Sequence, residues 1–338
     1  MRSQEFSELA TAHCAELRAH CYRMLGSVQD AEDAVQEALV RAWKAIDRFE
    51  GRGAVRSWLY SIATNTALDI ARARSRREFP VDLGAPAGPG AALDPPLTDR
   101  PWLEPYPDQW LTAPAQPSPE ARYEQRESIE LAFIVAMQHL PPLQRAVLLL
   151  REVAGFSAAE TASQLGTSVA SVTSALQRAR ATVSGQLPDL SQQATLRMLG
   201  DQRTRDVVRR YADAMERGDI PALTAMLTDD VTWSMPPIPT WFSGRDQALD
   251  FLARYPLTDQ WKHRQARACG QLAVACYVYD EDADDFIPGA LDVLTLRGDK
   301  IAAVTGFLTA DILGPQEAGG WVRGARLFER FGLPAAAP

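Results

Sequence analysis

Residues 80 to 119 contain eleven of the chain's 23 prolines. Proline has no backbone N–H and a fixed φ, so this density excludes helices and sheet ladders. The 338-residue chain should therefore fold as separate units joined by an extended linker. Within the linker, PWLEPYPDQW carries Trp102, Tyr106 and Trp110. An inert spacer would not need these rings, so we expect them to dock on a surface.

Residues 5 to 78 show the apolar spacing of amphipathic helices. Ser27 followed by Asp30 marks a helix start, because a serine side chain accepts a hydrogen bond from the N–H three residues later. The apolar positions that follow are Val35, Leu39, Ala42 and Ile46. After a glycine-containing break at 49–53, a further helix opens near Ser57. This part is expected to be entirely helical.

Residues 120 to 187 are expected to be helical and to end in a helix-turn-helix. In SAAETASQLGTSVASVTSALQRARATV (157–183), apolar or small residues recur every three or four positions, Val169 among them. Gly166-Thr167-Ser168 supplies a turn and a helix cap between the two halves. This arrangement is typical of the DNA-binding helix-turn-helix.

From about residue 200 to 332 the pattern changes to helices followed by strands. Apolar spacing at Val207, Tyr211 and Met215 predicts a helix that ends at Gly218. Four strand-like runs come later, namely DVTWSM, QLAVACYVYD, ALDVLTLRG and KIAAVTGFLT. Leu-Arg-Gly-Asp-Lys (296–300) predicts a hairpin turn between the last two. Helices preceding strands in this order favour an α+β domain.

His13-Cys14 and His20-Cys21 raise the question of a metal site. Their spacing is not that of a zinc knuckle, so a stripe of small residues on a buried helix is expected instead. The other two cysteines, Cys269 and Cys276, imply no disulfide framework. We expect no metal and no cofactor.

No run of about 18 apolar residues occurs, and the N-terminus lacks the apolar core of a secretory signal. We therefore expect no membrane span and a cytoplasmic protein. The net charge of −8 argues against nucleic-acid binding at first sight. However, the acidic excess lies in 80–119 and 188–338, and the remaining segments carry 18 bases and 17 acids.

Two blocks of the sequence resemble sigma factors of the extracytoplasmic-function group. The block beginning at Leu17, which contains GSVQDAEDAVQEALVRAW and SWLYSIATNTALD, is similar to region 2. The block LPPLQRAVLLLREVAGFSAAETASQLGTSVASVTSALQRAR is similar to region 4. The linker stands where this group lacks region 3. WLEPYPD and the third domain resemble the subgroup with a C-terminal SnoaL-like extension.

The resemblance implies a multi-domain protein with two all-α sigma domains and a C-terminal α+β SnoaL-like domain shaped as a cone. Region 2 would be a helical bundle and region 4 a helix-turn-helix. The expected boundaries are region 2 at 5–78, linker at 79–119, region 4 at 120–187 and the SnoaL-like domain at 200–332.

The resemblance also implies that the chain binds the β′ and β subunits of core RNA polymerase and opens promoter DNA. In the family, one polar helix face binds the β′ coiled coil. Here that face corresponds to Asp30, Asp33, Gln36, Glu37 and Arg41. An extruded base of the minus-ten element would be held by stacking and hydrogen bonds, and nearby arginines would neutralise phosphates. The corresponding residues are Phe49, Trp58, Asn65, Arg72, Arg74, Arg76 and Arg77, although Trp58 also suits a core position.

The outward face of the second helix of the helix-turn-helix should contact the minus-thirty-five element in the major groove. Its residues are Ser168, Ser171, Thr173, Ser174, Gln177 and Arg178. Arg178 lies late in the helix, where phosphate contacts are favoured over base contacts. We therefore expect modest direct readout and a larger share of shape readout.

A SnoaL-like domain implies an apolar cavity, which an unidentified small ligand could occupy. The residues expected to line it are Trp233, Met235, Trp241, Trp261, Tyr277 and Phe307. His263 and Asp292 are the available acid–base groups, but no nucleophile–base constellation is present. Since fold alone does not confer activity, we expect no enzyme. This domain is expected to regulate the sigma module in cis.

Two other classes of function stay open at this point. One is a DNA-binding regulator that acts without polymerase, which would have no need of a melting pocket. The other is a small-molecule enzyme with a DNA-binding appendage, which would need a catalytic constellation. Co-purification with core polymerase tests the first, and turnover by the 200–338 fragment tests the second.

Overall fold

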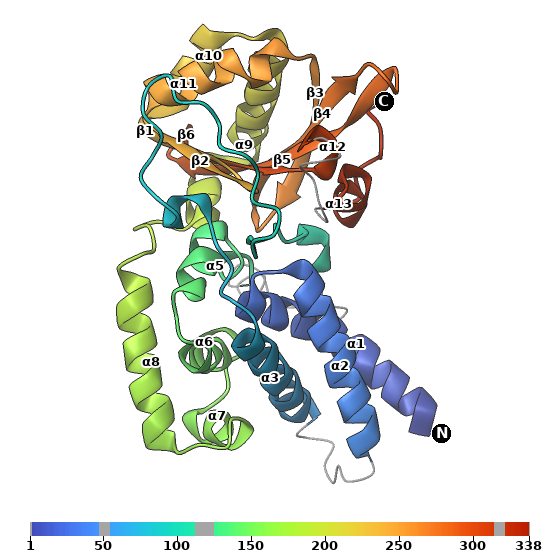
Figure 1. Cartoon of the computed structure of the whole chain (residues 1–338). Coiled ribbons are helices and arrows are strands. Elements are labelled where there is room, and N and C mark those ends of the chain that lie inside the picture. The colour runs from blue at the N-terminus through green and yellow to red at the C-terminus, as the bar shows by residue number, and fades with distance from the viewer. Residues whose placement is uncertain (1, 47–54, 112–124, 314–321, 338) are drawn as a thin grey trace. The chain divides into compact units, whose positions relative to one another are not determined.

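The computed structural model describes residues 2–46, 55–111, 125–313 and 322–337 (Figure 1). The chain divides into two compact units, one made of residues 1–77 and 103–189, the other of residues 78–102 and 190–338. The boundary falls inside the proline-rich segment. The expected linker at 79–119 is therefore shared between the two units.

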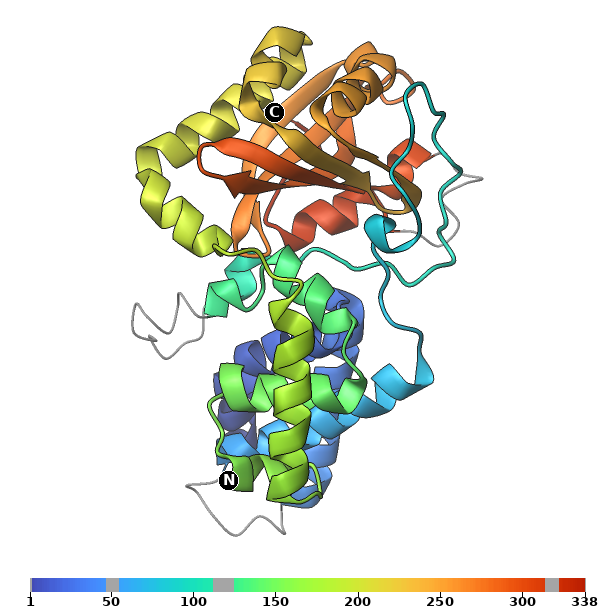
Figure 2. The ribbon, with the colours of Figure 1, turned by 90° about the vertical axis from the view of Figure 1, so that its left-hand side faces the viewer.

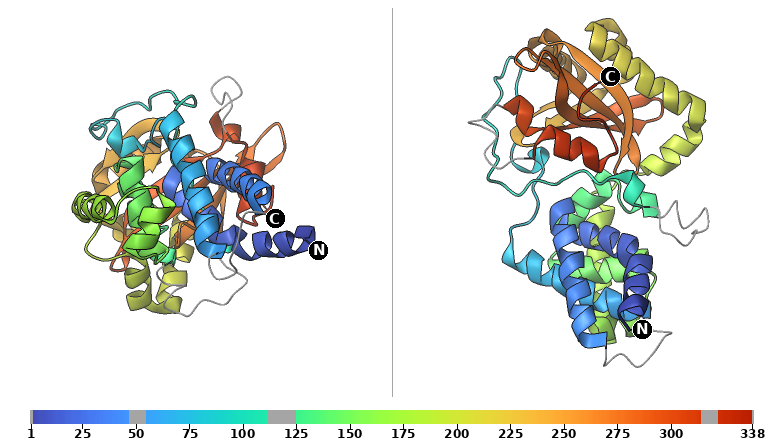
Figure 3. Two further views of the ribbon diagram at one scale, coloured as in Figure 1. Left: turned by 90° about the horizontal axis from the view of Figure 1, so that it is seen from below. Right: turned by 90° about the vertical axis from the view of Figure 1, so that its right-hand side faces the viewer.

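Three long helices form the first part of the first unit: α1 (Arg2–Leu25), α2 (Val28–Ala45) and α3 (Val55–Ala73). Each contacts the other two (Figure 3). As expected, Ser27 caps α2, its Oγ accepting a hydrogen bond from the Asp30 N–H at 3.1 Å. Cys21 is a free, fully buried thiol of α1, which agrees with a packed helix stripe.

The second part of this unit consists of shorter helices: α5 (Leu131–Gln138), α6 (Pro142–Leu148), α7 (Ala158–Gln164) and α8 (Val169–Ser184). A π-helical turn, η5 (Leu149–Val153), prolongs α6. Ser157 caps α7 in a capping box with Glu160, and Ser168 caps α8. The predicted helix-turn-helix is thus α7 and α8. Val169 departs from the expected pattern, because it is 48% exposed at the first position of α8.

Two buried arginines join the helix groups of the first unit. Arg145 of α6 donates to the carbonyl of Met24 at the end of α1 and to Gln138 Oε1 at 2.9 Å. Arg23 of α1 donates to the carbonyl of Ser128 at 3.0 Å. Carbonyl acceptors offset part of the cost of removing these cations from water. The two groups consequently pack as one body.

The second unit is built on a six-stranded sheet in the order β2-β1-β6-β5-β4-β3. Its strands are β1 (Leu227–Met235), β2 (Ile238–Ser243), β3 (Trp261–Ala268), β4 (Gln271–Asp280), β5 (Asp285–Arg297) and β6 (Lys300–Leu308). Only the β1–β6 pairing in this described sheet is parallel. The predicted hairpin is confirmed, since Arg297 pairs with Lys300 and Gly298 has φ 64°.

Helices cover both faces of this sheet (Figure 2). On one face lie α9 (Gln192–Arg217), α10 (Ile220–Met226) and α11 (Arg245–Arg254). On the other, α13 (Gly324–Arg330) packs on β5, and its Phe328 meets the Tyr277 ring edge-on. A short helix, α12 (Ala310–Leu313), follows β6. The sheet and its covering helices form the expected α+β domain.

The C-terminal domain begins earlier than the expected residue 200. α9 starts at Gln192, whose side chain donates to the Leu296 carbonyl at 2.9 Å and accepts from the Leu296 N–H at 2.7 Å. Gly200, with φ 75°, kinks the helix. The apolar spacing of Val207, Tyr211 and Met215 predicts only the part of this helix that follows the kink.

The first half of the linker lies along the sheet edge. Ala87 N–H donates to the Trp241 carbonyl at 2.8 Å, and Leu97 N–H donates to the Pro237 carbonyl at 2.9 Å. Since β2 is an edge strand, these bonds satisfy backbone groups that would otherwise face solvent. A 3-10 turn, η3 (Pro80–Asp82), precedes them.

The second half of the linker packs on the first unit. The Tyr106 ring is buried against Tyr22, with ring centres 4.6 Å apart. Trp110, in the 3-10 turn η4 (Asp108–Trp110), lies under the Arg18 guanidinium at 4.7 Å. In the first half, Trp102 is also buried and donates to the Leu97 carbonyl. The expectation that these aromatic side chains dock is confirmed.

In the described parts of the chain, every helix is too short or too polar to cross a bilayer.

Candidate promoter, polymerase and ligand sites

Helix α2 presents a polar face to solvent. Asp33, Gln36, Glu37 and Arg41 are all exposed, and Arg41 Nε donates to Glu37 Oε1 at 2.8 Å. Arg41 also reaches Asp69 of α3 at 3.4 Å. Pairs this exposed contribute at most about 1 kcal/mol, so these side chains can exchange partners at little cost. The face predicted for core polymerase is therefore accessible.

The structure corrects the expected position of Asp30. Its side chain is buried at the start of α2, where it forms ion pairs with Arg74 and Arg77. The Asp30 carboxylate lies in the first turn of α2, close to the end of α3. Arg74 and Arg77, which follow α3, neutralise its charge. Asp30 therefore holds region 2 together and does not share the exposed face of α2.

The ion pairs of Asp30 give the four arginines of the predicted phosphate-binding cluster different roles. The Arg77 side chain is only 14% exposed, and burial lowers its pKa. Arg72, Arg74 and Arg76 remain exposed, although Arg74 also reaches Asp30 and Arg76 lies 2.8 Å from His139 Nδ1. Arg77 is thus mainly a structural cation, and the other three can approach phosphates.

Two exposed apolar side chains on α2 were not anticipated. Val40 is 46% exposed and Trp43 is 44% exposed, on the turn that follows the polar face. An exposed tryptophan beside polar groups is typical of a protein interface. The signal in the sequence is that these positions fall outside the apolar rhythm of Val35, Leu39 and Ala42.

Asn65 lies exposed on α3, and both of its amide hydrogens are in use. Nδ2 donates to the Ser61 carbonyl at 2.8 Å and to the Gln164 carbonyl at 3.2 Å. Gln164, at the end of α7, also donates to Ser57 Oγ at 2.8 Å. The expected base-binding amide is therefore exposed but hydrogen-bonded to α7 in this structure. Trp58 is half-buried, and Phe49 lies outside the described residues.

The outward face of α8 agrees with the sequence. All six residues expected to face DNA are exposed: Ser168, Ser171, Thr173, Ser174, Gln177 and Arg178. Arg180 is already paired with Glu152. Within the described chain, Arg178 forms no such ion pair, so its guanidinium is the one most available to a phosphate.

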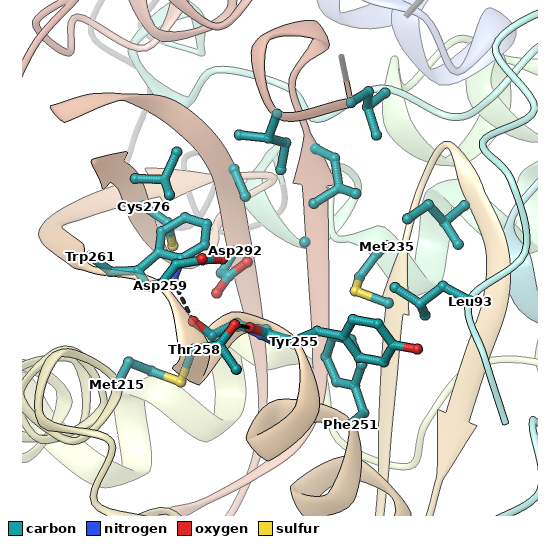
Figure 4. A pocket seen from close by; sticks show the side chains of 18 of the residues that line it. Leu93, Met215, Met235, Phe251, Tyr255, Thr258, Asp259, Trp261, Cys276 and Asp292 are labelled. Atoms are coloured by element: carbon teal, nitrogen blue, oxygen red, sulfur yellow. Dashed lines mark hydrogen bonds between the residues drawn. The ribbon is translucent and has the colours of Figure 1, made fainter. Parts of the chain in front are cut away.

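The concave face of the sheet encloses a cavity of about 460 Å³ (Figure 4). Three of the six predicted residues line it: Trp233, Met235 and Trp261. The other three do not. Trp241 lies on the edge strand and donates to the Gly84 carbonyl of the linker, while Tyr277 and Phe307 do not line the cavity. Side chains alternate along a strand, and Cys276 faces the cavity, so Tyr277 faces the opposite side.

Asp292 projects from β5 into this cavity, with Cys276 and Trp261 beside it (Figure 4). Tyr211 of α9 donates its hydroxyl proton to Asp292 Oδ2 at 2.8 Å. Burial raises the pKa of Asp292 to about 6, against the smaller opposing effects of hydrogen bonds from Tyr211 and Cys276. A Cβ at Gly306 would lie 2.9 Å from Asp292 Oδ1, so this glycine leaves room for the carboxylate.

His263 is the second buried titratable group on this wall. Its side chain is 1% exposed, and Nδ1 lies 3.4 Å from a carboxylate oxygen of Glu216 on α9. Neither ring nitrogen makes a hydrogen bond in the described structure. Burial lowers the pKa of His263, outweighing Glu216, so the neutral imidazole is favoured.

Comparison with known proteins decides the family. Family models match three segments: Sigma-70 region 2 at residues 9–77, Sigma-70 region 4 at 130–183 and a SnoaL-like domain at 208–304. The ECF RNA polymerase sigma factor SigG of Mycobacterium tuberculosis is 38% identical over 336 residues, which cover 98% of this chain and 85% of the relative. The chain belongs to the extracytoplasmic-function sigma factors. It directs RNA polymerase to specific promoters and initiates transcription.

Other relatives extend over part or all of this sigma factor. The RNA polymerase sigma-H factor of Pseudomonas aeruginosa is 33% identical over 172 residues, 51% of this chain and 80% of the relative. The crystal structure of SigJ from M. tuberculosis, an extracytoplasmic-function sigma factor, aligns with TM-score 0.57 at 23% identity. It covers 94% of this chain and 99% of that one, so the fold is shared along almost the whole length. These relatives are sigma factors.

Proposed function

We propose that this sigma factor is regulated in cis by its SnoaL-like domain, acting through the proline-rich linker. The polar face of α2 binds the coiled coil of the polymerase β′ subunit in the cytoplasm, and Asn65 captures a base of the minus-ten element. The exposed face of α8 reads the minus-thirty-five element, and Arg178 contacts a phosphate. A DNA-binding regulator that acts without polymerase would need no melting pocket, and a small-molecule enzyme would need a catalytic constellation. Neither alternative fits a chain of this family.

One observation carries the regulatory proposal: Glu104 of the linker completes the N-terminus of α2. Its carboxylate accepts hydrogen bonds from Ser27 Oγ at 2.8 Å and from the Val28 N–H at 3.0 Å. Its backbone N–H donates to the Gly26 carbonyl, and its carbonyl accepts from the Tyr22 hydroxyl at 2.7 Å. An anion at this end of a helix is favoured by the helix dipole. The linker is therefore bonded to the helix that carries the polymerase-binding face.

The other half of the linker is bonded to the SnoaL-like domain. The Asp94 N–H donates to Thr240 Oγ1 at 2.8 Å, and that hydroxyl donates to Asp94 Oδ2 at 2.7 Å. Leu93 lines the cavity. Residues 95–103 connect these contacts to Glu104, and within this segment the Leu97 N–H also donates to the Pro237 carbonyl at 2.9 Å. A ligand that moves Leu93 can thus change the position of the linker segment that caps α2. This requires that the ligand bind one conformation of the linker more tightly than the other.

Truncation after Leu187 tests this regulation in transcription assays with purified core polymerase. The cut falls in the segment that precedes α9 and spares every helix of the sigma regions. Higher transcription than the full chain indicates an inhibitory domain, and lower transcription indicates a scaffold. Equal rates across salt and promoter concentrations would refute regulation in cis.

A point substitution tests the route through the linker. Thr240→Val keeps the volume of the side chain but removes both bonds to Asp94, so it should reproduce part of the truncation effect. Thr224→Val is the matched control, because that hydroxyl donates to the Ile220 carbonyl within α10. If the Thr240 variant transcribes like the control, the domain does not regulate transcription through its contact with Asp94.

A further inference from the structure

The cavity combines features of a binding site that the transcription function does not use. Its volume of about 460 Å³ lies in the range of small-molecule sites. At about 30 Å³ per non-hydrogen atom, the space suits a ligand of roughly ten to fifteen such atoms.

The walls favour a molecule with an apolar, flat body. Aromatic rings come from three elements of the domain and from the turn after α11: Trp233, Phe251, Tyr255 and Trp261. Leu93, Met215 and Met235 fill the intervening positions. Aromatic faces attract both apolar surface and cations. Packing against these walls therefore determines the shape of the ligand's apolar body. The buried titratable side chains determine which polar group the ligand can carry.

Those buried groups offer hydrogen-bond acceptors. Asp292 accepts hydrogen bonds from Cys276 and, on Oδ2, from the Tyr211 hydroxyl, and its Oδ1 lies beside Gly306 of the cavity wall with further acceptor capacity. In the neutral imidazole of His263, a proton on Nδ1 faces Glu216, and Nε2 is then an acceptor without a partner in the described structure. A ligand that only donates hydrogen bonds matches both groups. A carbonyl or carboxylate ligand matches neither.

The charge of the lining points the same way. Four aspartates line the cavity against a single arginine: Asp259, Asp280, Asp292 and Asp311, with Arg254. Arg254 is already paired with Asp250 at 2.6 Å. Among the described residues, no lysine or arginine forms an ion pair with Asp292, although it is only 6% exposed. A buried carboxylate without a counter-ion is costly, and a cation in the cavity would offset that cost.

We propose that this cavity binds a small protonated amine, with its apolar body against the aromatic walls and its ammonium group on Asp292. The ammonium group has three donors and no acceptor, as the two buried acceptors require. The anionic lining excludes carboxylates and phosphates. Such an amine would be the effector in the proposed regulation in cis. Only its regulatory consequence rests on that proposal, because binding is measured without transcription.

The affinity should depend on pH through Asp292. The titratable groups that face or line the same space are Tyr211, Cys276, His263 with Glu216, Arg254, Asp259, Asp280 and Asp311. Burial raises the pKa of Tyr211 and of Cys276 well above their usual ranges, so both keep their protons. With the Asp292 pKa at about 6, the carboxylate is mostly protonated at pH 5 and mostly ionised at pH 7.5. Amine affinity should rise about tenfold between these values.

Calorimetric titration of the full chain with three probes of one shape tests the proposal. The probes are 1-naphthylmethylamine, 1-naphthylmethanol and 1-naphthoate, which are cationic, neutral and anionic. The amine should bind at least tenfold more tightly than the alcohol at pH 7.5, and the naphthoate should not bind. In Asp292→Asn this preference should disappear. Asp299→Asn is the control, because it removes an exposed acid in the β5–β6 turn, outside the lining, and should change amine affinity less than threefold.

Several results would overturn the proposal. These are an alcohol that binds as tightly as the amine, measurable naphthoate binding, no amine binding at millimolar concentration, or unchanged amine affinity in Asp292→Asn. The probe series and its pH dependence on the parent chain decide the matter even if the variant fails to fold. If the amine binds but transcription is the same with and without it, regulation in cis is refuted and the binding site stands.

Discussion

Replacing Glu104 with alanine should loosen the first turn of α2 while the linker backbone stays in place. The change removes the hydrogen bonds that the carboxylate accepts from Ser27 Oγ at 2.8 Å, from the Val28 N–H at 3.0 Å and, more weakly, from the Gln29 N–H at 3.5 Å. It spares the bonds of the Glu104 backbone to Gly26 and Tyr22. Because the site is partly exposed, water replaces some of the lost bonding, and the net loss is about 2 kcal/mol. This corresponds to about a thirtyfold shift in the local opening equilibrium.

Amide hydrogen exchange reads this equilibrium directly. The Val28 and Gln29 amides should exchange about thirtyfold faster in Glu104→Ala, whereas amides in the middle of α2 should be little affected. Glu104→Gln keeps an acceptor oxygen and should show a smaller acceleration. Asp99→Ala, which removes an exposed acid from the same linker, serves as the control. Parental exchange rates in Glu104→Ala would mean that the carboxylate does not hold the helix start.

Three further predictions concern promoter contacts and pH. Asn65→Ala should lower open-complex formation, seen by permanganate footprinting, with core binding intact and rescue by a pre-melted promoter; parental melting would remove Asn65 from the site. Changing Ser171 and Thr173 should alter the sequences recovered from a randomised promoter, while Arg178→Ala should weaken all sequences alike and reduce the salt slope by about one. Asp292 has a folded-state pKa of about 6, above its unfolded value of about 3.9, so the native state binds the extra proton between these values. The thermal midpoint of the parent should therefore fall, relative to Asp292→Asn, as pH rises from 4 to 6 and then level off; parallel pH profiles would contradict this.

The sequence predicts features that depend on a few neighbouring residues. The caps at Ser27 and Ser168 and the turn at Gly298 are found where the pattern places them, because each is decided within about four residues. Strands β2 and β3 were missed. β3 has the sequence WKHRQARA and lies at the sheet edge, and it contains too few apolar residues for an apolar alternation to mark it.

Features that depend on distant residues needed the structure. Asp30 is buried because it pairs with Arg74 and Arg77. These arginines lie 44 and 47 positions later in the sequence, so no local pattern predicts the contact. The structure shows that Cys276 lines the cavity. Because side chains alternate along a strand, its neighbour Tyr277 then points to the other face of the sheet. Tyr211 was correctly placed on a helix, but its bond to Asp292 spans 81 positions and follows only from the packing of α9 on the sheet.

The contact of Gln164 with α3 sets an order of events at the promoter. Positions minus ten and minus thirty-five are about 25 base pairs apart, or roughly 85 Å of duplex at about 3.4 Å per pair. Regions 2 and 4 cannot occupy both elements while Gln164 is bonded to Ser57, Ser61 and Asn65. Separating the two regions breaks these three bonds and also the bonds of Arg145 to the Met24 carbonyl and of Arg23 to the Ser128 carbonyl, so promoter binding has to supply the free energy of separation. In the proposed role of Asn65, DNA and region 4 would compete for the same amide. The two regions must therefore separate before both promoter elements can be bound.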